Sequence, residues 1–166
     1  MALPPQANGP AAAVGAIMQS IDAGRFPWWY PTNARGLQID YAVLGFEFIP
    51  LAASTTDIRV INVPGDSAFC VLSAVLVETD TANTTFLDQF PLLTAVFDSG
   101  QRQLSNIAIH ASNWFGTAQL PKYWDVPKIY APNVTINVQM QNLEAVARNL
   151  RGALHGFKIF TYPAVR

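Results

Sequence analysis

The feature that most constrains this chain is an alternation of apolar and polar side chains with a period of two residues. It is clearest in residues 134–141, which read Val-Thr-Ile-Asn-Val-Gln-Met-Gln. Successive side chains of a β-strand point to opposite faces of a sheet. This segment is therefore expected to be a strand with one buried face and one face in water.

Segments of strand character follow one another from residue 37 onward. Strands are expected at residues 37–43, 46–48, 58–62, 69–77, 92–97, 104–109, 134–140 and 150–162. Residues 69–77 are apolar in both phases, which indicates a central strand buried on both faces. The apolar phase changes after Gly45, which indicates either a β-bulge or a break between two strands. No helical spacing separates the segments, so the sequence predicts an all-β domain over residues 37–166, a single β-sandwich or jelly roll.

The alternation also predicts which residues form the core, and two glycines predict close contacts between backbones. Gly152 and Gly156, in the last expected strand, are typical of positions where another backbone passes closely. Residues 79–90 and 110–133 are expected to be long loops, which are often functional. The expected core residues are Phe46, Phe48, Phe69, Val71, Val75, Phe97, Ile136, Val138, Leu154 and Phe160.

Residues 1–36 differ from the rest and are expected to be an N-terminal arm with a short amphipathic helix. Val14, Ile17, Met18 and Ile21 are spaced i, i+3, i+4, i+7, which places them on one helical face. An isolated helix of about 14 residues is marginal in water. The apolar stripe is therefore expected to dock, either on its own domain or on a neighbouring chain.

Aromatic residues gather in two places outside the expected strands. The prolines in residues 26–31, Phe-Pro-Trp-Trp-Tyr-Pro, predict an extended segment that either plugs the β domain or anchors a neighbouring subunit. The segment 110–133 holds a second group, which could contact protein or stack on sugars. The candidate protein-interface residues in the two groups are Phe26, Trp28, Trp29, Tyr30, Trp114, Phe115, Tyr123 and Trp124.

Charge and cysteine content exclude several classes of function. Only 13% of the residues are charged, where about 25% is usual, which favours a surface covered by partner chains. The ten basic residues are scattered, so nucleic acid is not an expected partner. No apolar stretch approaches the roughly 20 residues of a membrane span, and the N-terminus lacks the pattern of a secretory signal. Cys70, the single cysteine, is expected to be a buried apolar residue.

The chain does not have the residue patterns of an enzyme. Its two histidines, His110 and His155, are 45 residues apart, and no nucleophile, phosphate-binding or metal-ligand motif accompanies them. We expect no catalytic residue, no cofactor and no bound metal. A calcium site built from two loops stays open as an alternative, since several acidic residues lie near expected turns: Asp57, Asp66, Glu78, Asp80 and Asp88.

Four segments of the C-terminal two thirds carry a recognisable series of motifs. They are 97–104 (Phe-Asp-Ser-Gly-Gln-Arg-Gln-Leu), 115–121 (Phe-Gly-Thr-Ala-Gln-Leu-Pro), 126–133 (Val-Pro-Lys-Ile-Tyr-Ala-Pro-Asn) and 154–160 (Leu-His-Gly-Phe-Lys-Ile-Phe). In this order they resemble a group of structural proteins in the virions of tailed bacteriophages. Ala118 stands where that group often has glycine, and the resemblance covers residues 40–160 without the arm.

The resemblance implies a non-enzymatic virion protein, either a capsid decoration (cement) protein or a minor head protein. Its expected partners are the major capsid protein, other virion proteins and its own copies in a homo-oligomer, assembled in the host cytoplasm. Residues 1–36 are expected to carry a large share of the binding between subunits. Two alternatives remain open at this point: a neck, collar or tail component, and a carbohydrate-binding β-sandwich.

Overall fold

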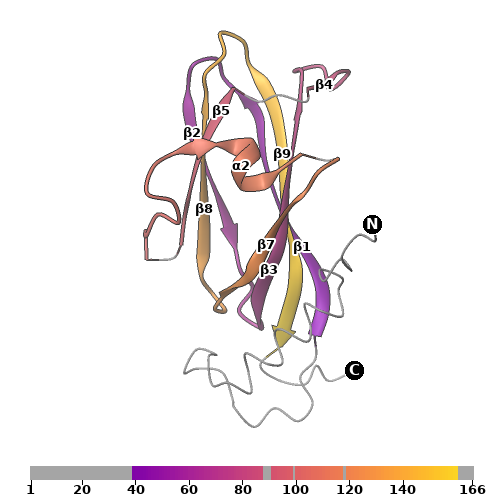
Figure 1. Ribbon diagram of the computed structural model, residues 1–166, viewed down its shortest axis with the longest axis vertical. Helices are drawn as coiled ribbons and strands as arrows, with labels where there is room; N and C mark the ends of the chain where they lie inside the picture. The colour runs from indigo at the N-terminus through magenta and orange to yellow at the C-terminus, as the bar shows by residue number, and fades with distance from the viewer. Residues whose placement is uncertain (1–38, 88–90, 99, 118, 161–166) are drawn as a thin grey trace, which may run out of the picture.

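The computed structural model describes residues 39–87, 91–98, 100–117 and 119–160. Two antiparallel sheets make up most of the regular structure, so the expected all-β sandwich is confirmed (Figure 1). In chain order the elements are β1 (Ile39–Leu51), β2 (Thr56–Asn62), β3 (Ser67–Thr79), β4 (Phe86–Leu87), β5 (Leu92–Phe97), β6 (Ile109–His110), α2 (Ala111–Phe115), β7 (Lys122–Tyr130), β8 (Thr135–Asn142) and β9 (Arg148–Phe160).

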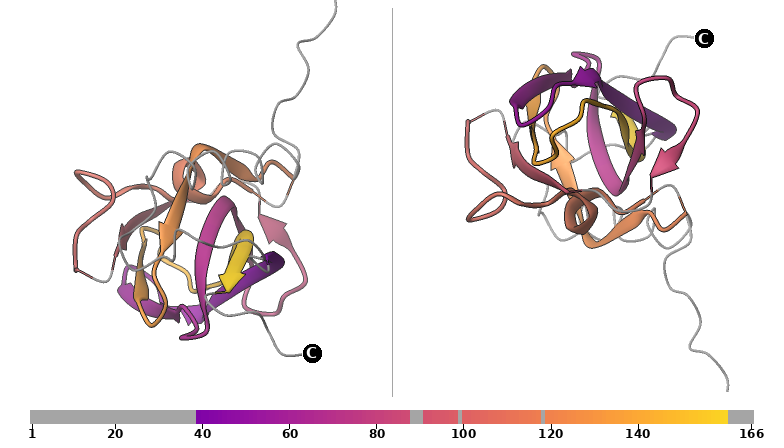
Figure 2. Two further views of the ribbon diagram at one scale, coloured as in Figure 1. Left: turned by 90° about the horizontal axis from the view of Figure 1, so that it is seen from below. Right: turned by 90° about the horizontal axis from the view of Figure 1, so that it is seen from above.

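The strands are connected as a jelly roll. The five-stranded sheet has the order β1-β9-β3-β4, with β7 also paired to β3, and the four-stranded sheet has the order β2-β8-β5-β6. Leaving the two-residue β4 aside, the outermost strands of the sequence pair first: β1 with β9, β2 with β8, β3 with β7, and β5 with β6. Nested antiparallel pairing of this kind wraps one long hairpin into the two facing sheets of a jelly roll. Figure 2 shows the strands end-on, arranged around a shared interior.

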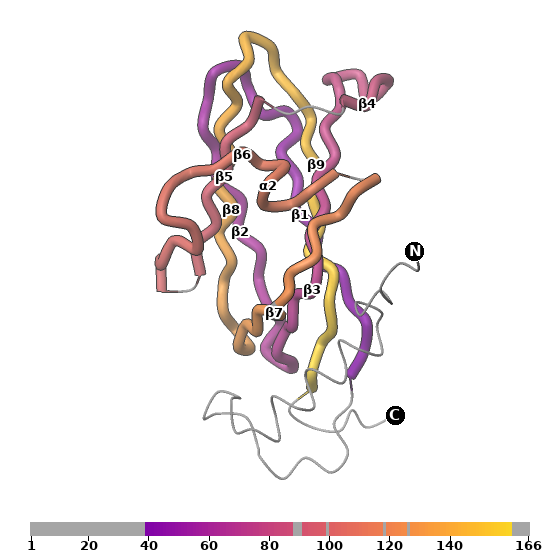
Figure 3. The backbone as a smooth tube through the Cα atoms, viewed as in Figure 1, coloured from indigo at the N-terminus to yellow at the C-terminus, as the bar shows by residue number. Residues whose placement is uncertain are grey.

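The connections between strands gather at the two ends of the sandwich. The β1–β2 and β8–β9 turns lie side by side at the upper end of Figure 3, where the backbone N–H of Ser54 donates to the carbonyl of Glu144 at 2.9 Å. At the lower end, the N–H of Val63 donates to the carbonyl of Val134 at 2.9 Å. The beginning of β1 and the end of β9 also meet there, since Ile39 pairs with Ile159.

The core lies between the two sheets. β8 follows the sequence expectation closely, because Ile136, Val138 and Met140 are fully buried while Thr135, Asn137 and Gln139 are only partly covered. Seven of the ten expected core residues are buried: Phe46, Phe48, Phe69, Val71, Ile136, Val138 and Leu154. Val75, Phe97 and Phe160 are half-buried instead.

An irregularity in β3 explains why Val75 does not belong to the core. The register of β3 against both β7 and β9 shifts between Val71 and Ser73, so Leu72 is an extra residue in the strand. The core-facing phase therefore changes from Phe69 and Val71 to Ala74 and Leu76. Val75 pairs with Ala153 and lies on the outer face of the sheet.

The expected irregularity at Gly45 in β1 is absent, which corrects that prediction. Residues from Ile39 to Phe48 pair with β9 in one continuous register, and the register shifts only between Phe48 and Leu51, around the cis Ile49–Pro50 bond. The apparent change of phase has another cause. Tyr41 and Val43 lie on the outer face of the sheet, whereas Phe46 and Phe48 point into the core.

The segment 110–133 is not one long loop, because it contains α2 and the nine-residue β7. A proline cannot donate a hydrogen bond to a sheet, and β7 contains Pro127. In the structure it falls in a stretch where pairing with β3 is interrupted, since Lys128 pairs with Val71 but the next pair is Tyr123 with Ser73. The strand expected at residues 104–109 is reduced to the two residues of β6.

The close backbone approach expected at the two glycines of β9 is confirmed at Gly156, whereas the close neighbour of Gly152 is a side chain. A Cβ added at Gly156 would overlap the carbonyl of Cys70, which belongs to the neighbouring strand. A Cβ added at Gly152 would overlap the ring of Phe46. Gly152 therefore makes room for a core side chain, and Gly156 for the irregular backbone of β3.

Candidate protein interface

The candidate interface residues of the segment 110–133 are held by α2 and β7. α2 spans the open side of the sandwich and contacts β5 and β6 on one sheet and β3 and β7 on the other (Figure 1). Ring centroids lie 5.3 Å apart for Phe46 and Phe115, 5.6 Å for Phe115 and Trp114, and 4.7 Å for Trp114 and Trp124. The structure thus brings Trp114, Phe115 and Trp124 into one series of rings that runs outward from the core.

Phe115 has to be corrected as an interface residue, because its side chain is fully buried in the core. It fills the side of the sandwich that α2 closes. Trp114 and Trp124 are half-buried and pack against the same core. Their rings are tilted by 60° and contact each other, so each ring shields part of the other from solvent.

Tyr123 is separated from the tryptophans. It pairs with Ser73 on β3, and its side chain is 56% exposed. Neighbouring residues of a strand point to opposite faces, so Tyr123 lies on the outer side of the sheet while Trp124 packs inward. The remaining candidates lie outside the described residues: Val14, Ile17, Met18, Ile21, Phe26, Trp28, Trp29 and Tyr30.

The five-stranded sheet has an apolar outer face, which the sequence expectations included only as burial of residues 69–77 on both faces. We call this surface the outer apolar face, and it consists of Ala68, Cys70, Leu72, Ile129, Phe157 and Ile159 together with Tyr41 and Val43 on β1. Tyr41 is 64% exposed and Val43 is 46% exposed. The Tyr41 hydroxyl lies 2.7 Å from Nδ1 of His155, and the Tyr41 ring packs edge-on against Phe157.

Two signals in the sequence could have revealed this face. The first is the apolar character of residues 69–77 in both phases, which requires cover on both sides of the sheet. The second is the position of Ile39, Tyr41 and Val43 in the phase opposite to Phe46 and Phe48. Taken together, they indicate a sheet with apolar residues on its outer side as well as in the core.

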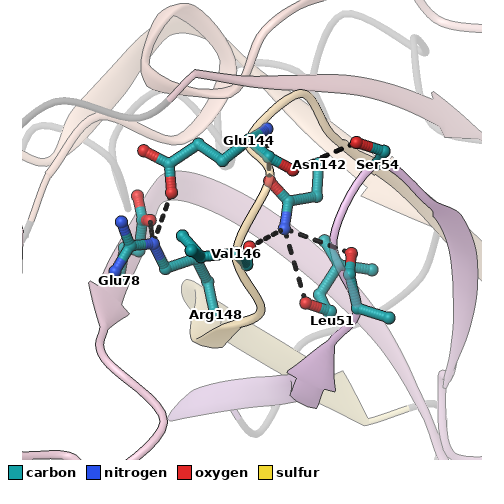
Figure 4. A network of polar contacts seen from close by, with 8 residues as sticks. Leu51, Ser54, Glu78, Asn142, Glu144, Val146 and Arg148 are labelled. Carbon is teal, nitrogen blue, oxygen red and sulfur yellow. Dashed lines mark hydrogen bonds and ion pairs between the residues drawn. The ribbon is translucent and has the colours of Figure 1, made fainter.

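A polar network fastens the upper end of the sandwich (Figure 4). The side-chain amide of Asn142, which is buried, donates to the carbonyls of Ala52 at 3.1 Å and Val146 at 2.9 Å, and its oxygen accepts from the N–H of Glu144 at 2.9 Å. Ser54 donates its hydroxyl to the carbonyl of Glu144 at 3.2 Å. The network therefore ties the β1–β2 turn to the β8–β9 turn.

Beside this network lies a buried carboxyl group. Glu78, on the core side of β3, has its Oε1 3.3 Å from Nε of Arg148, which also contacts the carboxylate of Glu144. Burial, together with the nearby Glu144 carboxylate, raises the pKa of Glu78 to about 7, and Arg148 opposes this shift. Glu78 was considered a calcium-site candidate, but in the structure its charged partner is an arginine.

The two histidines lie on different elements and have different neighbours. His110 is exposed at the start of α2, and His155 contacts Tyr41 on β1. Among residues 39–160, leaving out those not described, no three His, Cys, Asp or Glu side chains gather closely enough to hold a metal ion. No helix in the described part is long and apolar enough to cross a membrane.

Comparisons with known proteins give no family for this chain. No protein-family model matches the sequence, and a search of curated proteins finds no match either. A solved structure that is similar is the crystal structure of infectious bursal disease virus VP2 subviral particle, with a TM-score of 0.38 and 11% sequence identity. The alignment covers 75% of this chain and 33% of the VP2 chain, so this chain spans about a third of that protein's length. A likeness of this degree carries no conclusion about function.

Proposed function

We propose that this chain is a non-enzymatic structural protein of a bacteriophage virion that binds the capsid shell and its own copies, as a decoration or minor head protein. The observation that carries the proposal is a set of large apolar side chains that stay exposed on the strands. A jelly roll needs only its inner faces to be apolar, yet Ile58 and Val60 on β2 are 50% and 56% exposed, and Tyr123 on β7 is 56% exposed. Apolar surface beyond the core is typical of chains that contact other protein segments.

Two further observations support this proposal. Jelly rolls are the domains of many viral capsids as well as of lectins and cupins. The low charge content agrees with a surface that partners cover.

A binding experiment with virus particles tests the proposal. Purified chain is added to shells that lack it, and the bound copies are located by antibody labelling in electron micrographs. A decoration protein would label the whole shell. Label at one vertex only would instead favour the neck, collar or tail alternative, and failure to bind any part of the particle would contradict the virion proposal.

The non-enzymatic part of the proposal has its own test. Substrate turnover by the purified chain that disappears on substitution of His110 or His155 would contradict it.

For the carbohydrate alternative, Tyr123 is the better probe than the tryptophans, because Trp114 and Trp124 also pack on the core. Binding to a glycan array that Tyr123→Ala abolishes would favour a lectin-like role.

A further inference from the structure

The outer apolar face is continuous across four strands. Tyr41 on β1 pairs with Phe157 on β9, Phe157 with Cys70 on β3, and Cys70 with Ile129 on β7. The next row toward the lower end contains Ile39, Ile159 and Ala68. Charged residues that pair on this side of the sheet, Glu47 and Arg151, lie toward the opposite end, where their side chains are 3.7 Å apart.

Three side chains of this face are fully buried although they point away from the core. Ala68, Cys70 and Ile159 each have an exposed fraction of 0% within a single chain. They form a cluster of their own with Leu72, Ile129 and Phe157, separate from the core between the sheets. Burial within one chain favours cover by the same polypeptide over cover that needs a second copy.

The rest of the polypeptide joins the fold at the margin of this face. β1 begins at Ile39 and β9 ends at Phe160, both at the lower end of Figure 1. The nine steps from Tyr30 to Ile39 can span about 30 Å when extended. Crossing from β1 to β7 takes three strand spacings of about 4.8 Å, or roughly 15 Å. Residues 26–30 are therefore within reach of every strand that carries the face.

The chemistry of residues 26–30 fits this surface. Phe26, Trp28, Trp29 and Tyr30 are aromatic, and no charged residue occurs between Arg25 and Arg35. Aromatic side chains bury on the order of 150–250 Å² each, which suits a broad apolar sheet face. Pro27 and Pro31 lack backbone donors, so the segment is better suited to lie over the face than to pair with the outer edge of β1.

We propose that Phe26–Tyr30 packs on the outer apolar face of its own chain and covers Cys70 and Phe157. A tether of eight residues keeps the segment at an effective concentration in the millimolar range, which favours its own sheet over that of a second copy. The helical stripe at residues 14–21 is then left for a neighbouring chain. This inference does not depend on the virion role, because it concerns contacts within one chain.

The reactivity of Cys70 can be used to detect this contact, because Cys70 is the only cysteine in the sequence and any thiol labelling must occur there. Burial raises the pKa of the Cys70 thiol to about 12, so the covered group holds almost no reactive thiolate at neutral pH. The experiment measures the rate at which a maleimide or an aromatic disulfide labels Cys70 in the full chain. The decisive variant is Trp28→Ala with Trp29→Ala.

We expect the double alanine variant to be labelled at least tenfold faster than the native chain. Trp28→Phe with Trp29→Phe keeps the aromatic bulk and should keep the protection, and Ile17→Ala with Met18→Ala should leave the rate unchanged. Labelling rates are measured at several low denaturant concentrations. A rate that does not vary with denaturant reports local uncovering, whereas a rate that rises steeply reports unfolding of the whole domain.

Three results would overturn the inference. Equal labelling rates in the native and double alanine chains would mean that residues 26–30 do not cover the face. Fast labelling after deletion of residues 161–166 alone would assign the cover to the C-terminal tail. Protection that is lost on dilution of the native chain would assign it to the arm of a second copy. If the double alanine variant does not fold, Trp29→Ala alone is compared with Trp29→Phe by the same measurement.

Discussion

Among the residues that the structure describes, the carboxyl group of Glu78 has a pKa that is raised into the neutral range. Its pKa is about 7 in the folded chain and 4.5 as the ordinary value, so the folded chain binds more protons between these two pH values. The unfolding free energy contributed by this group is therefore fully present below pH 4.5 and is lost as pH rises through 7. A difference of roughly 2.5 units corresponds to about 3 kcal/mol.

Glu78→Gln should remove this loss, because the amide is neutral at every pH. The free energy of unfolding is measured by urea titration at pH 5 and at pH 8. Between these two pH values it should fall more for the native chain than for the variant. Glu47→Gln serves as the matched control, since its side chain is 64% exposed. A native chain and a Glu78→Gln variant with the same pH dependence would contradict the buried-carboxyl interpretation.

Core burial at single positions can be tested with three phenylalanines. Phe69 is fully buried and Phe69→Ala should lower the free energy of unfolding by about 3–5 kcal/mol. Phe86 is 74% exposed, so Phe86→Ala should change it by less than about 0.5 kcal/mol. Phe97, which is half-buried, should fall between them. Denaturant titrations rank the three, and any other order would contradict the assigned burial.

At the residue scale, the sequence predicted burial better than it predicted partners. Ile136, Val138 and Met140 could be identified because their environment repeats every second residue. The pairing of Glu78 with Arg148 could not, since 70 positions separate them and no local pattern links their side chains. Phe115 was assigned to the surface because its neighbours are aromatic, but its ring fills the gap that α2 covers.

Among the elements, β9 depends most on small residues. It lies between β1 and β3, so its backbone is enclosed on both edges. A methyl group at Gly156 would meet the backbone carbonyl of Cys70, which has no room to yield, whereas one at Gly152 would meet the ring of Phe46, which can shift. Overpacking of this kind costs about 1–3 kcal/mol, and sometimes more.

Gly156→Ala should therefore destabilise the domain more than Gly152→Ala, as judged by the midpoint of thermal or urea unfolding. Gly45→Ala is the control on the neighbouring strand, because a Cβ there would lie at an ordinary 3.9 Å from the carbonyl of Gly152. The three variants should rank in the order Gly156, Gly152, Gly45. A Gly156→Ala chain as stable as the native one would refute the close approach.

Strands were predictable where one face is wet, and the errors arose where both faces are apolar or where pairing is irregular. β8 alternates cleanly and was located to within two residues. In β1 the apolar residues change from the outer to the inner face, which imitates a bulge in the sequence. The true bulge at Leu72 has no glycine to mark it, and β7 was hidden by Pro127 in its unpaired middle.

For the whole molecule, the class of fold followed from periodicity, but the order of the strands did not. The nested pairing joins β1 to β9 and β2 to β8 over nearly the full length of the domain. Such contacts depend on how whole sheets pack, and no local sequence pattern predicts them. The boundary between arm and domain at residue 36 stays a prediction, because the described residues begin at Ile39.

Assembly is the property of the whole molecule on which the virion proposal depends. If residues 26–30 cover their own sheet, the helical stripe Val14, Ile17, Met18 and Ile21 is the part of the arm left for a neighbour. Burying each such side chain contributes on the order of 1.5–3 kcal/mol. Four together can offset much of an association cost estimated at about 4–15 kcal/mol. The stripe should therefore set the oligomeric state.

The variant Ile17→Gln with Met18→Gln tests this expectation in the full chain. It removes half of the stripe and leaves the aromatic run in place, so the domain should stay folded and Cys70 should stay protected. Light scattering should then give a smaller particle mass, and the variant should no longer add to shells that lack the native protein. Gln19→Ala is the matched control, because residue 19 falls on the face of the expected helix opposite to the stripe. An unchanged mass and unchanged occupancy in the Ile17→Gln, Met18→Gln chain would mean that subunits meet elsewhere, and the exposed Tyr123 on β7 would be the next candidate to substitute.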